Sequence, residues 1–286
     1  MPMNPRLLRP TASGVHPEAN AWRNAVIANG GTVSGSTLNA VSRFCRSVDA
    51  AGIRDRFFRL NLFCGTGLNA VLVPLYRGPS RTGTQYGNTT DTNSNFVSGD
   101  YVETGASGGL TGNASNKSLN TGLTPATLDT NSRHLSCYAM TKTTGTFRSY
   151  IGCRTDGTQS GAWFNIWQTG DSNSLTLHCL GANTSPAAGV VTGGYNVGLL
   201  QACNDATTGT YYGNGTSISA DDTGQTPIAG NSRNITVFAL NFESGVGVHV
   251  DARMGGYSVG AFMSAAQAAS FNTAMQAFQT ALGRNV

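Results

Sequence analysis

The sequence predicts a mainly β protein: a sandwich or barrel of short strands with an N-terminal helical hairpin and a C-terminal helix. Short strand-like runs separated by Gly-, Asn- and Thr-rich turns occupy residues 57–260, and no helix-like pattern of useful length interrupts them. Apolar residues at helical spacing occur at the two ends of the chain instead. We therefore expect an arm and helical hairpin at 1–56, a sandwich at 57–260 and a helix at 261–286 packed on the sandwich.

Two helices are expected near the N-terminus. Pro17 suits the first turn of one helix, which should end at Asn29-Gly30-Gly31. The second should run from Ser36-Thr37 to Ala51-Gly52. Before them, Leu7 and Leu8 lie in a proline-containing segment without apolar periodicity. This segment is either an anchoring arm that orders against another protein or a frayed terminus.

The β region contains eleven candidate strands. Alternation of apolar and polar residues is clearest in 163–168 and 235–240. Regularly spaced turns between the runs favour a sandwich or barrel over a parallel sheet with crossover helices. The expected strands are Phe57–Cys64, Leu68–Leu75, Tyr101–Glu103, His134–Thr141, Ser149–Arg154, Ala162–Gln168, Leu175–Leu180, Gly198–Asn204, Thr210–Tyr212, Ile235–Asn241 and Met254–Val259.

The C-terminal helix is the longest helical pattern in the chain. Ser264 can cap its start. Phe271, Met275, Phe278 and Leu282 follow at spacings of four, three and four, so they form one apolar stripe. A stripe of this width requires a surface to cover it, and the back of the sandwich can provide that surface.

The composition excludes several functions. Only 11% of the 286 residues are charged, less than half the usual share of about 25%, and the net charge is +4. A charge this small and scattered argues against a nucleic-acid partner. The longest apolar run, Leu68 to Leu75, is too short to cross a bilayer, so no membrane insertion is expected. Met1 to Pro10 lacks the apolar run of a signal peptide, and synthesis in the cytoplasm is expected.

No metal or cofactor is expected. The six cysteines form no C-x-x-C pair and have no histidine at metal-ligand spacing. They are either buried thiols or disulfides formed after release from the cytosol. Asp221-Asp222 lies in a Gly/Thr loop that could bind calcium, although a solvated turn is the more common role of such a pair.

No catalytic residue is predicted. Gly256–Gly260 matches the G-x-S-x-G pattern around Ser258, but every histidine precedes this serine, contrary to the hydrolase order. Gly65–Ala70 matches a dinucleotide fingerprint, yet a second strand is expected after it, so a hairpin turn is favoured. No strand carries the paired carboxylates of a glycosidase. The sequence therefore indicates a protein that is not an enzyme.

Aromatic residues give one candidate binding surface. Trp163 and Trp167 are four residues apart on one expected strand and therefore lie on the same face. Together with Tyr212 they could stack against a ligand such as a sugar. The alternative is that these rings fill the core.

Several short motifs resemble known proteins. Lys117–Leu123 and Tyr212–Ile218 are similar to segments of laminin-G-like (concanavalin-A-like) jelly rolls. The ordered series Arg59–Gly65, Asn69–Leu75, Phe96–Tyr101 and Phe278–Arg284 resembles virion proteins of bacteriophages and prophages. The resemblance implies a laminin-G-like domain at 57–260, that is, a two-sheet antiparallel jelly-roll sandwich. It also implies a place on the virion and no catalytic residue.

The resulting expectation is a non-enzymatic structural protein present in many copies on a bacteriophage virion, as capsid decoration, fibre or tail-associated protein. Its partners would be other virion proteins and copies of itself, and it would be synthesised in the host cytoplasm. The alternative is a tail-fibre receptor-binding or carbohydrate-binding module whose partner is a host-surface glycan.

Overall fold

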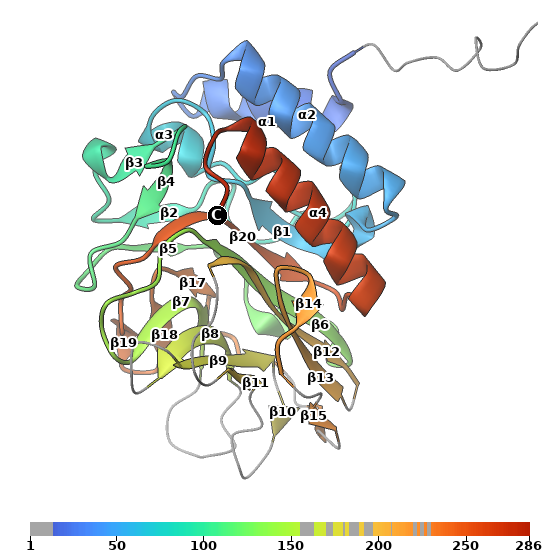
Figure 1. The fold of residues 1–286 in the computed structure, drawn as a ribbon, viewed down its shortest axis with the longest axis vertical. Coiled ribbons are helices and arrows are strands. Elements are labelled where there is room, and N and C mark those ends of the chain that lie inside the picture. The colour runs from blue at the N-terminus through green and yellow to red at the C-terminus, as the bar shows by residue number, and fades with distance from the viewer. Residues whose placement is uncertain are drawn as a thin grey trace, which may run out of the picture.

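The fold has three layers: helices, a first sheet and a second sheet (Figure 1). The computed structural model describes residues 14–154, 163–169, 174–179, 181–182, 189–191, 197–206, 208–219, 222–223, 226–227 and 230–286. Two nine-stranded sheets form within this part of the chain, and a two-stranded ribbon pairs Gly181–Ala182 (β10) with Thr226–Pro227 (β16). The predicted fold class, a mainly β two-sheet sandwich with helices at both ends, is confirmed.

Three long helices form the outer layer. They are α1 (Pro17–Ala28), α2 (Gly35–Ala50) and α4 (Ala265–Ala281). The side chain of Ser34 accepts the backbone N–H of Thr37, so α2 begins slightly before the predicted start. Ser264 and Gln267 form a capping box at the start of α4, which confirms the predicted cap. Short helical turns occur at α3 (Leu68–Val71), η2 (Arg54–Arg56), η3 (Ser98–Asp100) and η4 (Pro125–Thr127).

Sheet 1 has the strand order β14-β13-β12-β6-β20-β4-β3, and β1 and β15 pair with β20 and β13. All of its pairings are antiparallel. Its strands are β1 (Phe57–Asn61), β3 (Tyr101–Val102), β4 (Gly109–Thr111), β6 (Ser132–Ala139), β12 (Gly198–Asp205), β13 (Thr208–Gly213), β14 (Thr216–Ser217), β15 (Asp222–Thr223) and β20 (Arg253–Gly260).

Sheet 2 has the order β11-β9-β8-β7-β17-β5-β2, with β18 beside β7 and β19 beside β18. The bridge between β18 and β7 is parallel and the other pairings are antiparallel. Its strands are β2 (Thr92–Ser94), β5 (Ser118–Asn120), β7 (Arg148–Cys153), β8 (Phe164–Thr169), β9 (Ser174–Cys179), β11 (Gly189–Val191), β17 (Thr236–Val237), β18 (Leu240–Phe242) and β19 (Gly245–Gly247).

Alternation along the strands of sheet 1 separates two apolar layers. On β6, Leu135 and Cys137 face the interior between the sheets, whereas Tyr138 belongs to the layer under the helices. The helices therefore cover the outer face of sheet 1. Because that face is occupied, the outer face of sheet 2 is the sandwich face that the helices leave uncovered (Figure 1).

The apolar stripe of α4 packs on sheet 1 and α2 as predicted. Phe271, Met275, Phe278 and Leu282 are at most 4% exposed. The ring of Phe44 on α2 lies 6.5 Å from Phe271 and 5.9 Å from Phe278, both with edge-to-face geometry. This aromatic group joins the two ends of the chain.

Two predicted strands differ in the structure. The Leu68–Leu75 run forms the short helix α3, because Gly67 adopts φ 85° before it and Asn61 donates to the carbonyl of Val71 (2.8 Å). The Ile235–Asn241 run is broken at Phe238, which has φ 67°. This turn buries the Phe238 ring. The prediction of one continuous strand was therefore wrong in both segments.

A buried ion pair joins the 79–95 loop to sheet 1. The guanidinium of Arg59 lies 2.6 Å from Asp91 and also donates to the hydroxyl of Tyr257. The side chains of Arg59 and Asp91 are 0% exposed. The opposite charges and added hydrogen bonds compensate the cost of burying each group.

All six cysteines are buried and carry free thiols, which matches the first of the two alternatives. Burial raises the pKa of the Cys45 and Cys203 thiols to about 12. In the described part of the chain, no helix combines the length and apolarity needed to cross a bilayer.

Candidate functional site

The two tryptophans of the predicted stacking surface lie together on the outer face of sheet 2. Phe164 and Ile166 on β8 point into the sandwich core. Alternation therefore directs Trp163 and Trp167 to the opposite face, where both are partly exposed. Their ring centroids are 5.3 Å apart at an angle of 61°. The predicted shared face is confirmed for this pair.

Tyr212, the third residue proposed for stacking, lies elsewhere. It is on β13 of sheet 1, 5% exposed, in the apolar layer under the helices. Its neighbour Tyr211 faces the core between the sheets instead. The structure therefore assigns Tyr212 to packing and removes it from the candidate surface. The sequence pattern does not show which face of sheet 1 the helices cover, so it could not show that Tyr212 is buried beneath them.

Asn165 lies between the two tryptophans on the same face. Strand pairing places His178 of β9 beside it on one side and Gly152 of β7 on the other. The Asn165 side chain is 0% exposed, and neither its oxygen nor its nitrogen has a hydrogen-bond partner in the described part of the molecule. A buried amide without partners costs free energy, about 1–3 kcal/mol in typical cases. The amide is closed to solvent, so the partly exposed rings of Trp163 and Trp167, and not the amide, present a surface to a ligand here.

Gly152 makes room for this amide. A Cβ atom at Gly152 would lie 2.3 Å from the Cβ of Asn165 and 2.5 Å from the carbonyl oxygen of Phe164. No other residue type fits there without displacing the strand. The glycine therefore fixes where Asn165 lies in the site.

Further polar groups without partners lie on the same face. Ser149 is opposite Trp167, and Thr236 is opposite Gly152. The Ser149 and Thr236 hydroxyls and the indole N–H of Trp167 have no hydrogen-bond partner among the described residues. Together with Asn165 they combine hydroxyl, amide and indole groups beside two aromatic faces. These polar atoms are closed to solvent, so the two aromatic rings are the part of this group that a ligand can contact.

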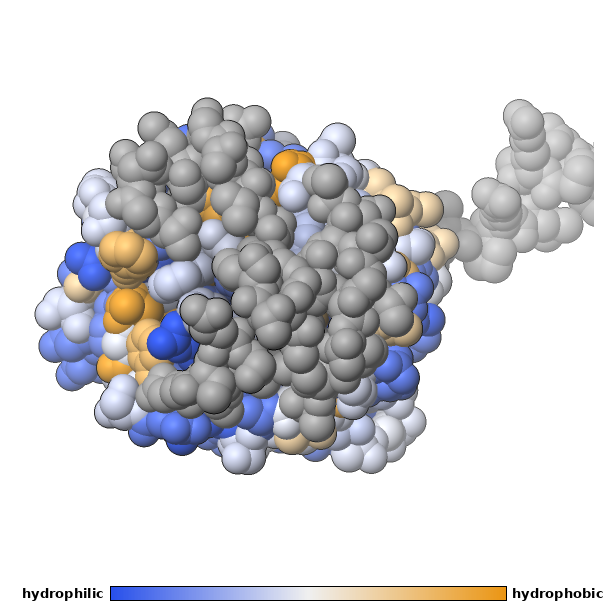
Figure 2. All heavy atoms as spheres, turned by 90° about the horizontal axis from the view of Figure 1, so that it is seen from below, coloured by the Kyte–Doolittle hydropathy of each residue, from blue (hydrophilic) through white to orange (hydrophobic). Residues whose placement is uncertain are grey.

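Arginine and aromatic side chains border the tryptophan pair. The guanidinium carbon of Arg154 lies 4.3 Å from the ring centroid of Trp163 and 4.8 Å from that of Phe242. Phe147, 52% exposed, lies 6.0 Å from Trp167. Figure 2 shows the side of the molecule opposite the helices, where apolar side chains form part of the surface.

His178 is neutral in this environment. Its ring lies 4.9 Å from Trp163. Burial, together with the charge of Arg154, lowers its pKa to about 3. A neutral imidazole offers one donor and one acceptor, so His178 adds polarity to the surface without adding charge.

Ser258 has a histidine partner that the order of residues along the chain did not suggest. Its hydroxyl lies 2.9 Å from Nε2 of His134 and 2.6 Å from the hydroxyl of Ser136. All three side chains are 0% exposed, and Nδ1 of His134 lies 2.6 Å from the carbonyl of Ala261. Ser258 is also inside β20 and not at a strand-to-helix turn. The pair is therefore closed to substrates and forms a buried hydrogen-bond network.

The residues with metal-ligand chemistry are engaged elsewhere. His16, Glu18 and Cys45 approach one another, but Glu18 forms an ion pair with Arg54 at 2.8 Å. His16 lies 2.8 Å from the carboxylate of Asp49. Of the suggested calcium ligands, Asp221 lies outside the described residues, as do Leu7 and Leu8 of the proposed arm, and Asp222 begins β15.

No protein-family model and no curated protein matches the sequence. Among solved structures, a mutant of Trypanosoma rangeli sialidase with trans-sialidase activity is 9% identical with a TM-score of 0.48, over 84% of this chain and 39% of the sialidase. The NanB sialidase of Streptococcus pneumoniae is 18% identical with a TM-score of 0.42, over 57% and 27%. A carbohydrate-binding module of a Ruminococcus gnavus sialidase, bound to sialyllactose, is 13% identical with a TM-score of 0.35, over 49% and 81%. This chain therefore spans well under half the length of both sialidases.

Proposed function

We propose that this chain is a non-enzymatic glycan-binding protein that acts as a multi-copy component of a bacteriophage virion. The observation that carries the glycan-binding part is the outer face of sheet 2. There, the partly exposed rings of Trp163 and Trp167 lie side by side, with their centroids 5.3 Å apart. Sugar rings stack their C–H faces on aromatic rings and exchange hydrogen bonds with amides and hydroxyls. The virion part is supported by the ordered sequence motifs and by the low surface charge.

A glycan array probed with the full chain tests the first part. We expect binding to at least one class of surface glycan, weakened about tenfold or more by Trp163→Ala or Trp167→Ala. Trp167→Phe should retain much of the affinity, because it retains an aromatic face. Val97→Ala removes an exposed apolar side chain far from the tryptophan pair in sequence and serves as the control.

Fluorescence gives a second readout. The chain contains three tryptophans, and Trp22 is buried in the helix layer. A bound sugar should therefore alter emission from Trp163 and Trp167, and the double variant Trp163→Phe/Trp167→Phe should lose this response. If no glycan binds, or if the alanine variants bind as well as the wild type, the glycan-binding proposal is wrong.

Mass spectrometry of purified particles tests the virion part. We expect the chain in particles produced by a host that carries its gene, in many copies per particle. Its absence from particles, despite expression in the same cells, would contradict this proposal. The non-enzymatic part predicts that Ser258→Ala changes neither glycan binding nor assembly, provided that the variant folds.

A further inference from the structure

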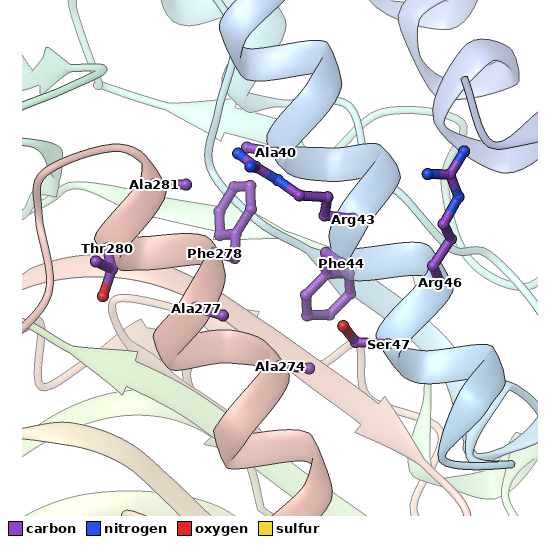
Figure 3. A pocket seen from close by; sticks show the side chains of 10 residues that line it. All are labelled: Ala40, Arg43, Phe44, Arg46, Ser47, Ala274, Ala277, Phe278, Thr280 and Ala281. Atoms are coloured by element: carbon purple, nitrogen blue, oxygen red, sulfur yellow. The ribbon is translucent and has the colours of Figure 1, made fainter. Parts of the chain in front are cut away.

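An open groove of about 540 Å³ lies between α2 and α4 (Figure 3). Its floor contains the rings of Phe44 and Phe278. Arg43, Arg46 and Ser47 line the α2 side, where Arg43 extends toward α4 and Arg46 extends away from it (Figure 3). The α4 side consists of small side chains, which leave space for another chain: Ala274, Ala277, Thr280 and Ala281.

The groove combines an apolar floor with positive charge on one side. Arg43 is exposed, and Arg46 donates to the carbonyl oxygen of Gly14. Neither arginine forms an ion pair within the described part of the chain. An occupant must therefore bring an apolar side chain and a carboxylate.

The chain's own N-terminal segment does not meet this requirement. Residues 1–13 lead up to Gly14 at the side of the groove, but they contain Arg6 and Arg9 and no carboxylate side chain. Like charges disfavour their approach to Arg43 and Arg46. The occupant must come from another part of the chain or from another molecule.

The hairpin of β18 and β19 has the matching chemistry. Phe242 pairs with Gly245, so Glu243 and Ser244 form a two-residue turn at its tip. Glu243 is exposed and forms no ion pair among the described residues. Val246, three residues later on β19, is a large apolar side chain that is 46% exposed. The tip therefore offers a carboxylate and an apolar group three residues apart.

We propose that the groove between α2 and α4 binds the β18–β19 hairpin tip of a second copy of this chain. Val246 packs on Phe44 and Phe278, while Glu243 pairs with Arg43. Helices α2 and α4 and the β18–β19 hairpin lie on different sides of the molecule (Figure 1), so the contact joins copies head to tail and leads to chains or closed rings. This contact would join the many copies of the chain that the proposed function includes, so the inference rests on that proposed function.

Sedimentation velocity of the purified full chain, from about 10 µM to about 1 mM, tests this contact. We expect concentration-dependent association that weakens at high salt, because the contact includes ion pairs. The groove variant Arg43→Glu/Arg46→Glu and the tip variant Glu243→Lys should each associate at least about tenfold more weakly. Arg81→Glu and Asp205→Lys make the same types of charge change at exposed residues outside both surfaces and should associate like the wild type.

Mixing the two reversed variants gives the decisive result. The negative groove of one then meets the positive tip of the other, so an equimolar mixture should associate again although neither variant does so alone. Recovery also shows that both variants are folded. A wild type that stays monomeric at about 1 mM, reversed variants that associate normally, or a mixture that stays monomeric would each overturn the proposal.

The same variants separate this proposal from the proposed function. Glycan binding depends on sheet 2, so the groove variant should bind glycan like the wild type. If glycan binding or virion incorporation is observed without self-association, only the groove proposal fails. If the wild type and the mixture associate but the chain binds no glycan and is absent from particles, the self-contact is established and the proposed function fails.

Discussion

At the scale of single residues, Asn165 shows how a binding surface differs from a core. Its amide is fully buried and has no hydrogen-bond partner in the described structure. A polar group in this state lowers stability, so its removal should raise the free energy of unfolding. Glycine at 152 creates the space that the amide occupies. Both residues are thus part of the arrangement that presents Trp163 and Trp167.

This explanation makes a prediction for Asn165→Leu, which has a similar volume and no polar atoms. We expect the free energy of unfolding to rise by about 1 kcal/mol, because an unsatisfied amide is removed. Glycan affinity should stay close to that of the wild type, because the amide is closed to solvent and both tryptophan rings are retained. Urea denaturation and glycan titration measure the two effects. A loss of stability together with unchanged affinity would show that the amide has a structural role.

His134 gives a prediction for pH. Burial lowers its pKa from 6.5 to about 4, although a hydrogen bond to Ala261 acts in the opposite direction. At pH values between about 4 and about 6.5, the His134 imidazole is therefore mostly protonated in the unfolded chain and mostly neutral in the folded chain. The contribution of this group to the free energy of unfolding is therefore complete above pH about 6.5. It is lost, by about 3 kcal/mol in total, as the pH falls from about 6.5 to about 4.

Urea denaturation across this pH range checks the effect. His134→Gln keeps a polar side chain without the titration, so the slope of stability against pH should become smaller. His178, whose pKa is lowered to about 3, should leave a residual slope in that variant. An unchanged slope in His134→Gln would contradict the assignment.

At the scale of elements, local pattern accounts for the helices and only part of the strands. The α4 stripe and its Ser264 cap could be read from spacing alone, because both depend on residues within one helix. The breaks at Leu68 and Phe238 could not, since they depend on Asn61 and on burial of the Phe238 ring. The same limit applies to the site. The tryptophan pair follows from alternation, whereas the position of Asn165 beside Gly152 requires the strand register.

The packing of α4 makes a prediction at this scale. Phe278 is 2% exposed, and its ring meets Phe44 and lies 5.6 Å from the guanidinium carbon of Arg284. Phe278→Ala should lower the free energy of unfolding by roughly 3–5 kcal/mol, as for other large buried aromatic side chains. Thr280→Ala, on the exposed side of the helix, should change it by less than about 0.5 kcal/mol. Equal effects of the two changes in denaturation experiments would mean that α4 contributes little to the folded state.

At the scale of the whole molecule, the three-layer arrangement separates two kinds of surface. The helices occupy one face of the sandwich, so the outer face of sheet 2 has no helix layer, and a groove lies between α2 and α4. The buried Arg59–Asp91 pair adds a link between the 79–95 loop and sheet 1. Its partners are far apart along the chain, so the sequence pattern contained no signal for it. The outer face of sheet 2 is mainly aromatic and polar, whereas the groove between α2 and α4 is bordered by charge.

This difference predicts that self-association depends more strongly on salt than glycan binding does. Exposed ion pairs weaken as the Debye length falls from about 10 Å at 0.1 M to about 3 Å at 1 M salt. Self-association through Arg43 and Glu243 should therefore weaken markedly over this range, as measured by sedimentation. Glycan binding at Trp163 and Trp167 relies on stacking and hydrogen bonds, so calorimetry should show less than about a threefold change in affinity over the same range. A steep loss of glycan affinity with salt would instead identify Arg154 at the edge of the surface as an ionic contact to the sugar, because it is the arginine that lies against Trp163.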